Sequence, residues 1–215
     1  DYIYREGRQE LDDDGNPIIR EKMIKAINQR STYGKEVMHT SWLEHEYKTM
    51  QLLYAAGVDI PKPYASGPNA ILMDFIGDDE MAAPTLNQVD LERDEAQLLF
   101  DRVIHNVELM LKHNRVHADL SAYNILYWEG EIILIDFPQA ISPVNNQSAY
   151  LIFKRDMLRI CEYFNRQGIV SDHEKLADSL WKINDLRQIP EFSLDLLDEE
   201  DESDREYWND LRDRI

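Results

Sequence analysis

Apolar residues that recur every three or four positions predict four helices in this chain. The first is expected to begin at Ser41, where Glu44 completes a capping box three residues later, and to end at Gly57. The other three are expected over residues 91–113, 149–167 and 172–185. Residues 1–39 are polar and contain turn signals, so we expect them to be loop-rich or partly helical.

Short apolar runs between turn residues predict strands. Residues 70–75 form one such run, which is expected to be a buried strand. Residues 125–128 and 132–135 flank Glu129-Gly130-Glu131 and predict a β-hairpin. Together these elements predict an α+β fold with two lobes that meet near residues 74–80.

Composition narrows the class of protein. The 215 residues are 43% hydrophobic, which supports a folded core and argues against a disordered chain. The formal net charge of −19 argues against nucleic acid or an anionic membrane as a partner, because most of the surface would repel phosphates. The single cysteine, Cys161, fits a reducing cytoplasm. We expect neither a membrane span nor a secretory signal.

Three side chains suited to phosphoryl transfer surround the predicted hairpin. Asn124 enters its first strand and Asp136 leaves its second, so both are expected at one edge, where oxygen ligands suit Mg²⁺ with a nucleotide. Asp119 lies on the preceding loop, close enough to accept a proton from a hydroxyl. Each residue alone is common in turns. Their combined order matches the catalytic loop and the metal-binding Asp of protein kinases.

The segments around these residues resemble the RIO family of atypical serine/threonine protein kinases and ATPases. They read His-Ala-Asp-Leu-Ser-Ala-Tyr-Asn at residues 117–124 and Ile-Asp-Phe-Pro-Gln at residues 135–139. Ordinary protein kinases usually place Lys where Ser121 stands, and aminoglycoside-type kinases usually place His there. The resemblance covers residues 40–168 and is nearest to bacterial members of the first RIO subgroup.

The resemblance implies a two-lobed protein-kinase-like fold and a role for each matched residue. Asp119 would be the catalytic Asp, with aspartyl-phosphate formation as a further role, and Asn124 and Asp136 would hold the metal. Glu46 would pair with a phosphate-binding Lys, with Glu44 as the alternative. The other implied residues are Met73, Asp74 and Ile76 at the adenine, His117, Ser121 and Tyr123 in support, and Ser31 and Thr32 as autophosphorylation sites in a flexible loop.

Several of these residues also have a simpler reading. Met73 fits the core of a strand equally well, and a Ser-Thr pair in a loop is ordinarily only a loop. His117 fits a structural hydrogen-bonding role at the base of the catalytic loop better than a role as general base.

The sequence departs from the family pattern near its beginning. Gly7 and Gly15 stand alone rather than in a Gly-rich loop, and no Lys lies in an apolar strand. The first strands of the N-terminal lobe are therefore expected to be absent from this sequence. The predicted divisions are a partial N-terminal lobe (1–76), a C-terminal catalytic lobe (77–190) and an acidic C-terminal tail (191–215).

The expected activity is phosphoryl transfer from ATP, with Mg²⁺ or Mn²⁺, to protein Ser or Thr including autophosphorylation, or ATP hydrolysis, in the cytoplasm. The protein substrate is not identified, and family analogy alone suggests a link to ribosome assembly. No direct nucleic-acid binding is expected. The alternatives are a small-molecule kinase of the aminoglycoside or sugar type and a nucleotide-binding pseudokinase scaffold.

Overall fold

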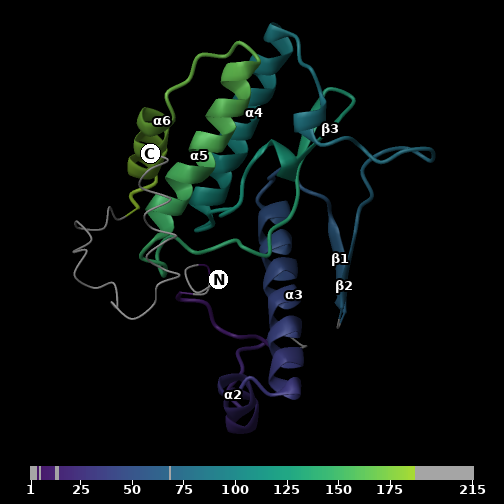
Figure 1. The fold of residues 1–215 in the computed structure, drawn as a ribbon, viewed down its shortest axis with the longest axis vertical. Helices are drawn as coiled ribbons and strands as arrows, with labels where there is room; N and C mark the ends of the chain where they lie inside the picture. The colour runs from purple at the N-terminus through teal and green to yellow at the C-terminus, as the bar shows by residue number, and fades with distance from the viewer. Residues whose placement is uncertain (1–3, 5, 13–14, 68, 187–215) are drawn as a thin grey trace.

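The computed structural model describes residues 4, 6–12, 15–67 and 69–186. A long helix, α3 (Thr32–Ala55), stands between the short helix α2 (Glu21–Asn28) and the rest of the molecule (Figure 1). A strand pair, β1 (Pro63–Gly67) and β2 (Ala70–Met73), runs alongside α3. The predicted α+β class is confirmed.

Helix α3 begins ten residues earlier than the capping signal predicts. Its N-cap is Ser31, whose hydroxyl oxygen accepts a hydrogen bond from the backbone N–H of Gly34 at 3.0 Å. Gly34 also allows α2 to approach, because a Cβ there would lie 2.0 Å from the carbonyl oxygen of Ala26. The expectation of a loop at Ser31 and Thr32 is therefore wrong, since both residues belong to the start of a helix.

Ser41, the expected cap, is instead buried in the middle of α3. Its hydroxyl accepts a hydrogen bond from the backbone N–H of Leu11 at 2.8 Å and donates one to Glu10 at 2.6 Å. Glu44 is buried as well and accepts a hydrogen bond from the hydroxyl of Ser66. The apparent capping box is thus a pair of polar residues that bind segments distant in sequence.

The strand at residues 70–73 is present but is not buried as predicted. Ile71 and Met73 pack against the core, whereas Leu72 is 64% exposed. Phe75, just beyond the strand, is 68% exposed. Helix α3 is the main helix packed on this two-stranded sheet, so the alternate side chains face solvent.

The predicted hairpin is confirmed as β3 (Ile125–Trp128) and β4 (Glu131–Leu134), paired antiparallel. Its two-residue turn has positive φ at both Glu129 (50°) and Gly130 (84°), which matches the right-handed twist of the strands. Before β3 lie two short 3₁₀ helices, η1 (Leu86–Gln88) and η2 (Ala122–Asn124).

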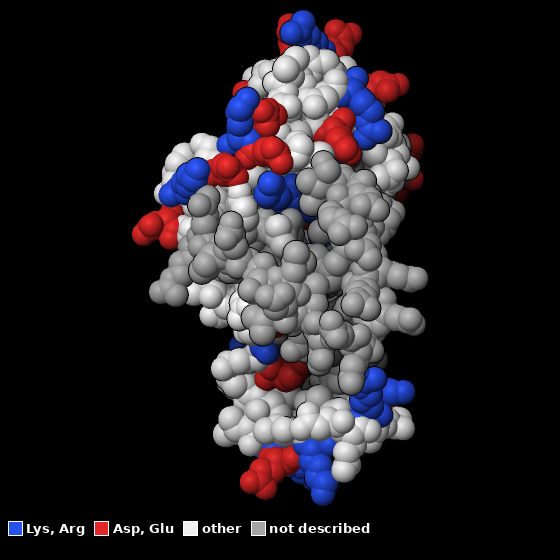
Figure 2. Space-filling model, turned by 60° about the vertical axis from the view of Figure 1, so that its left-hand side comes forward, with Lys and Arg blue, Asp and Glu red and all other residues white. Residues whose placement is uncertain are grey.

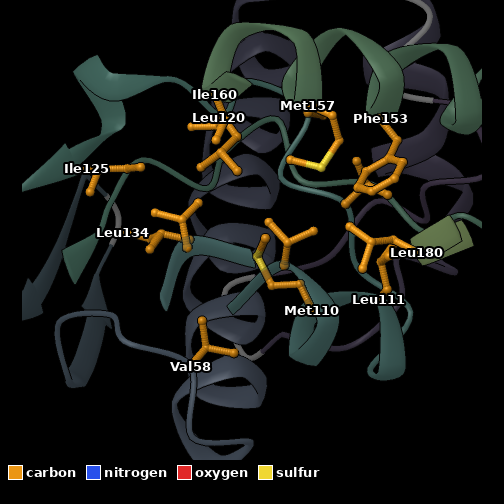
Figure 3. Close-up of a cluster of buried hydrophobic side chains, with 14 of the residues drawn as sticks. Val58, Met110, Leu111, Leu120, Ile125, Leu134, Phe153, Met157, Ile160 and Leu180 are labelled. Atoms are coloured by element: carbon orange, nitrogen blue, oxygen red, sulfur yellow. The ribbon is translucent and has the colours of Figure 1, made fainter. Parts of the chain in front are cut away.

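Three further helices form a bundle beside the hairpin and confirm the predicted ranges to within two residues. They are α4 (Arg93–Lys112), α5 (Ala149–Arg166) and α6 (His173–Ile183). Figure 3 shows their apolar side chains meeting those of the hairpin and the turn after α3, among them Met110, Met157, Leu134 and Val58. Each fully buried side chain of this kind contributes about 2 kcal/mol to folding.

The surface of the chain is strongly acidic in sum but mixed locally. Figure 2 shows one face, on which Lys and Arg side chains lie among Asp and Glu side chains. Among the described residues, none of the helices has the length and apolar character that a membrane crossing requires. The predicted acidic tail, residues 191–215, lies outside the described residues, and the boundary at residue 76 stays a prediction.

Candidate active site

The edge of the β3–β4 hairpin brings the three candidate side chains together. The backbone N–H of Ile135 donates to the carbonyl oxygen of Asn124 at 3.0 Å, which holds the two ends of the hairpin side by side. The side-chain amide of Asn124 donates to the backbone oxygen of Asp119 at 2.9 Å and to its carboxylate at 3.3 Å. Asp136 follows Ile135 directly, so the loop, the amide and the second carboxylate meet at one place.

Strained backbone marks this region. Ala118 (φ 68°) and Asp136 (φ 71°) both lie in the left-handed region, where a residue with a Cβ is disfavoured. Such strain persists only where surrounding contacts fix it, and it gathers at functional sites. Ala118 directly precedes the candidate residue Asp119, and Asp136 is a candidate residue itself.

Helix α5 supplies the contacts that hold Ala118. The carboxylate of Asp156 accepts a hydrogen bond from the backbone N–H of Ala118 at 2.8 Å. The guanidinium of Arg155 donates to the carbonyl oxygen of the same residue at 2.5 Å. Because Asp156 is buried, the position of the loop is tied to the core of the bundle.

Negative charge accumulates on the hairpin side of the site. Burial raises the pKa of the Asp136 carboxyl, and the nearby Asp119 raises it further. The pKa of Glu46 is also raised, first by burial and then by the charge of Asp136. Carboxylates held this close favour a bound cation.

The donor set fits a divalent metal. Asp136 and Asn124 offer hard oxygen atoms at one edge, as Mg²⁺ and Mn²⁺ require. In the described part of the chain, no three His, Cys, Asp or Glu side chains form a metal-binding group by themselves. Further ligands for a metal at this edge would have to come from water or from nucleotide phosphates.

A cation balances Asp119 on its other side. The guanidinium of Arg159, from α5, lies 2.7 Å from the Asp119 carboxylate, and both side chains are about 40% exposed, at 39% and 44%. Sequence reasoning missed this arginine, as it missed Asp156 one turn earlier. A signal for Asp156 existed, because this carboxylate lies within the apolar stripe formed by Ile152, Phe153 and Ile160.

His117 lies at the base of the loop, as predicted, and is buried. Its Nε2 bonds the carbonyl oxygen of Ile135 at 3.1 Å, so Nε2 carries the proton. The ring also packs against Phe137, with centroids 4.8 Å apart. Burial lowers the pKa of His117 to about 4, which keeps the ring neutral at neutral pH.

Helix α3 reaches the site through Glu46 and Trp42. The backbone N–H of Phe137 lies near the Glu46 carboxylate and lowers its pKa, against the larger effects of burial and of Asp136, which raise it. The indole N–H of Trp42 donates to the carbonyl oxygen of Pro138 at 2.7 Å, and Arg8 donates to the same oxygen at 3.1 Å. Two turns of α3 therefore hold the segment that follows Asp136.

The remaining predicted residues lie in three places. Ser121 caps η2 by accepting a hydrogen bond from the backbone N–H of Tyr123, whose ring is exposed. Met73 ends β2, and the backbone N–H of the next residue, Asp74, donates to the carbonyl oxygen of Lys62 at 3.0 Å. Within the described residues, the carbonyl oxygen of Asp74 and the N–H of Ile76 have no hydrogen-bond partner. Ser31 and Thr32 lie at the far end of α3 (Figure 1).

A cavity of about 650 Å³ opens beside Asp119. Its wall includes Asn124 and Tyr123 from the loop and Arg159 and Arg166 from α5. It includes neither Asp136 nor any of residues 73–76, so it lies on the bundle side of Asp119.

Comparisons with known proteins identify the family of this chain. A family model described as the RIO domain matches residues 3–176. The RIO-type serine/threonine-protein kinase Rio1 of Thermoplasma acidophilum is 33% identical over 141 residues, which cover 66% of this chain and 73% of that protein. Rio1 of Haloferax volcanii is 30% identical over 138 residues, covering 64% of this chain and 47% of that protein. Human serine/threonine-protein kinase RIO3 is 30% identical over 129 residues, which cover 60% of this chain and 25% of that protein.

The helix, hairpin and helical bundle thus define a protein-kinase-like α+β fold. Within that class, the chain belongs to the RIO family. It spans about half of the Haloferax relative and a quarter of the human one. Both Rio1 and RIO3 relatives match at similar identity, so the placement among bacterial members of the first subgroup stays a prediction.

Proposed function

We propose that this chain transfers the γ-phosphoryl group of ATP to Ser or Thr hydroxyls of proteins, its own chain included, and that it also hydrolyses ATP. The observation that carries the proposal is the meeting of Asp119, Asn124 and Asp136 at one edge of the hairpin. The names of the relatives, all serine/threonine-protein kinases, agree with it.

In this proposal, Asp119 accepts the proton of the attacking hydroxyl. The hydroxyl oxygen forms a bond to the γ-phosphorus, the bond from that phosphorus to the bridging oxygen breaks, and ADP leaves. The hydrogen bonds from Asn124 keep the carboxylate of Asp119 aimed in one direction, which supports the role. The same carboxylate could take the phosphoryl group itself, as the family resemblance implies.

Asn124 and Asp136 would hold Mg²⁺ or Mn²⁺. A bound metal would neutralise charge on the β- and γ-phosphates, which is the main electrostatic need of this reaction. The raised pKa of Asp136 supports the assignment, since burial and then the nearby carboxylate of Asp119 both disfavour its charge in the absence of a cation.

The adenine would lie against Met73, with hydrogen bonds to the carbonyl oxygen of Asp74 and the N–H of Ile76. The absence of partners for these two groups within the described residues supports this position, because peptide groups rarely go unpaired without water or a ligand. Glu46 would pair with the phosphate-binding Lys that the family resemblance implies, His117 would support the loop, and Ser121 and Tyr123 would shape its outer side. Ser31 and Thr32 remain candidate autophosphorylation sites.

Two variants separate the proposed roles. Asp136→Ala should weaken Mg-ATP binding and abolish turnover together, because the metal site is lost. Asp119→Asn should keep nucleotide binding while lowering turnover by about 10²-fold or more. Calorimetric titration with Mg-ATP and a radiolabelled phosphate assay, on the protein at its native length, measure both quantities.

Asp101→Asn is the matched control, since Asp101 is an exposed residue of α4 outside the site. It should behave as the wild type does. Equal loss of nucleotide binding in the Asp119 and Asp136 variants would overturn the assignment of roles. Absence of any phosphoryl transfer or ATP hydrolysis by the wild type would overturn the proposed function.

A further inference from the structure

The cavity beside Asp119 carries no net formal charge, although the chain as a whole has 23 basic residues against 42 acidic ones. Two arginines in its wall, Arg159 and Arg166, balance Asp119 and Glu162. Both arginines come from one face of α5, with Glu162 between them. The remaining wall is polar or aromatic, with Asn87, Tyr163 and Gln167 among its members.

The cavity is on the side of Asp119 from which an acceptor would have to arrive. Asp136 and residues 73–76, the proposed metal and adenine positions, are not part of its wall. Asp119 itself is, and its carboxylate is partly exposed there. A hydroxyl bound in this cavity would therefore lie next to the proposed proton acceptor without displacing the nucleotide.

We propose that this cavity is the acceptor subsite and that it selects a Ser or Thr of a peptide that carries a carboxylate about three residues away. This inference rests on the proposed function and adds the class of substrate to it. Guanidinium groups bind carboxylates through paired, charge-assisted hydrogen bonds, which are stronger than neutral ones. Arg159 is already bound to Asp119, so Arg166 is the group that recognises the peptide.

The spacing of the two arginines sets the position of the recognised carboxylate. Arg166 lies seven positions after Arg159, which corresponds to about 10.5 Å along a helix. An extended peptide covers about 10 Å in three residues. With the acceptor hydroxyl at Asp119, beside Arg159, the third residue before or after it reaches Arg166.

Recognition has to come from these local contacts. A chain with net charge −19 repels an acidic ligand at long range. Salt near physiological strength screens such repulsion beyond about 8 Å and weakens contacts inside a cavity much less. Binding should therefore be measured near physiological ionic strength.

The chain itself provides two contrasting probes. A synthetic peptide of residues 197–209 contains one hydroxyl acceptor of this type, Ser203, with Glu200 three residues before it and Glu206 three residues after it. A peptide of residues 26–37 contains Ser31 and Thr32, which have no acidic residue at either of these spacings. The first should bind and become phosphorylated in preference to the second.

Three measurements test the selection. Arg166→Gln should weaken binding of the acidic peptide by about tenfold, the loss expected for one charge-assisted hydrogen bond. Glu162→Gln should strengthen it, because a repelling carboxylate leaves the wall. Lys22→Glu, a charge reversal at an exposed position of α2 outside the cavity, is the control and should leave binding unchanged.

Reversing the charge on both the protein and the peptide distinguishes lost recognition from a folding defect. Arg166→Glu should bind a 197–209 peptide with Lys at positions 200 and 206 better than the native peptide, reversing the wild-type preference. Binding is followed by fluorescence anisotropy without ATP, and transfer by radiolabelled phosphate with ATP.

The outcomes separate the two proposals. Equal binding of both peptides, or no effect of Arg166→Gln, would overturn the acceptor subsite even if the wild type hydrolyses ATP. Selective, Arg166-dependent binding in a protein that never turns over ATP would contradict the proposed function and leave only a peptide-binding site. Preference for the 26–37 peptide would also overturn the inference.

Discussion

At the scale of single residues, the surroundings of His117 decide its role. Its imidazole is buried against Phe137 and donates to the carbonyl oxygen of Ile135, so it links the loop that carries Asp119 to the segment that carries Asp136. Its Nδ1 has no hydrogen-bond partner among the described residues. A neutral ring with one bonded nitrogen suits a structural link, because protonation would place an unpaired charge in the core.

This burial predicts a pH dependence of stability. Burial lowers the pKa of His117 to about 4 in the folded state, below the ordinary value of 6.5. Between these values the unfolded chain binds the proton more tightly, so His117 removes stability as the pH falls from about 6.5 to 4. Its contribution to the free energy of unfolding should drop by about 2 kcal/mol between pH 7 and pH 5.

The measurement is urea unfolding at several pH values for the wild type and for His117→Gln. The variant should be less stable at pH 7, and the gap to the wild type should narrow by about that amount at pH 5. His39→Gln, at an exposed position of α3, should keep the wild-type pH dependence. A constant gap between the wild type and His117→Gln would contradict a neutral, buried imidazole.

At the scale of elements, α5 is both a core helix and the support of the loop. Asp156 and Arg155 hold the N–H and the carbonyl oxygen of the strained residue Ala118. Replacing Asp156 with Leu should cost about 3 kcal/mol of stability, because it leaves the buried N–H of Ala118 unpaired and removes the carboxylate that faces the guanidinium of Arg155. The turnover should fall further than the loss of stability alone explains, since Ala118 directly precedes the proposed catalytic residue Asp119.

Asp156→Asn separates the positioning of Ala118 from the negative charge of Asp156, because it removes only the charge. Its side-chain oxygen can still accept the hydrogen bond from Ala118, so turnover should fall less than in Asp156→Leu. Thermal unfolding and steady-state kinetics at a temperature where both variants are folded measure the two effects. If the two variants lose the same turnover per unit of stability lost, the hydrogen bond to Ala118 has no positioning role.

Sequence patterns predicted the elements whose signals are local. The hairpin, with its Glu129-Gly130 turn, and the three bundle helices follow from residues adjacent in sequence. The start of α3 was missed because Ser41 has a cap-like neighbour, Glu44, while its true partners lie about thirty residues earlier. Hydrogen bonds across such distances leave no periodic signal.

The residues of the candidate site likewise divide into those with a local sequence signal and those without one. Asp119, Asn124 and Asp136 were found because they flank one predicted hairpin, and the structure brings them together. Arg159 was missed because it reaches Asp119 from a helix forty residues later. Its charge is unremarkable on a helix surface, so only the folded geometry reveals it.

At the scale of the whole molecule, the segment after Asp136 connects the two parts of the fold. Figure 1 shows α3 rising toward the hairpin from below the bundle. Trp42 of α3 and Arg8 of the N-terminal segment both donate to the carbonyl oxygen of Pro138. The position of the proposed metal ligand therefore depends on contacts to Pro138 from residues 96 and 130 positions earlier.

Trp42→Phe tests this connection. The variant keeps an aromatic ring at a partly exposed position but loses the N–H that binds Pro138. Losing one hydrogen bond of about 1 kcal/mol should speed amide hydrogen exchange across residues 136–141 by about fivefold. Turnover should fall by a similar factor, because Asp136 would occupy its proposed metal-binding position for less of the time.

Tyr47→Phe is the matched control, since it removes a hydrogen bond from α3 to Tyr64 instead. Faster exchange at residues 136–141 in both variants would point to general loosening of α3, and no change in Trp42→Phe would show that Arg8 alone fixes Pro138.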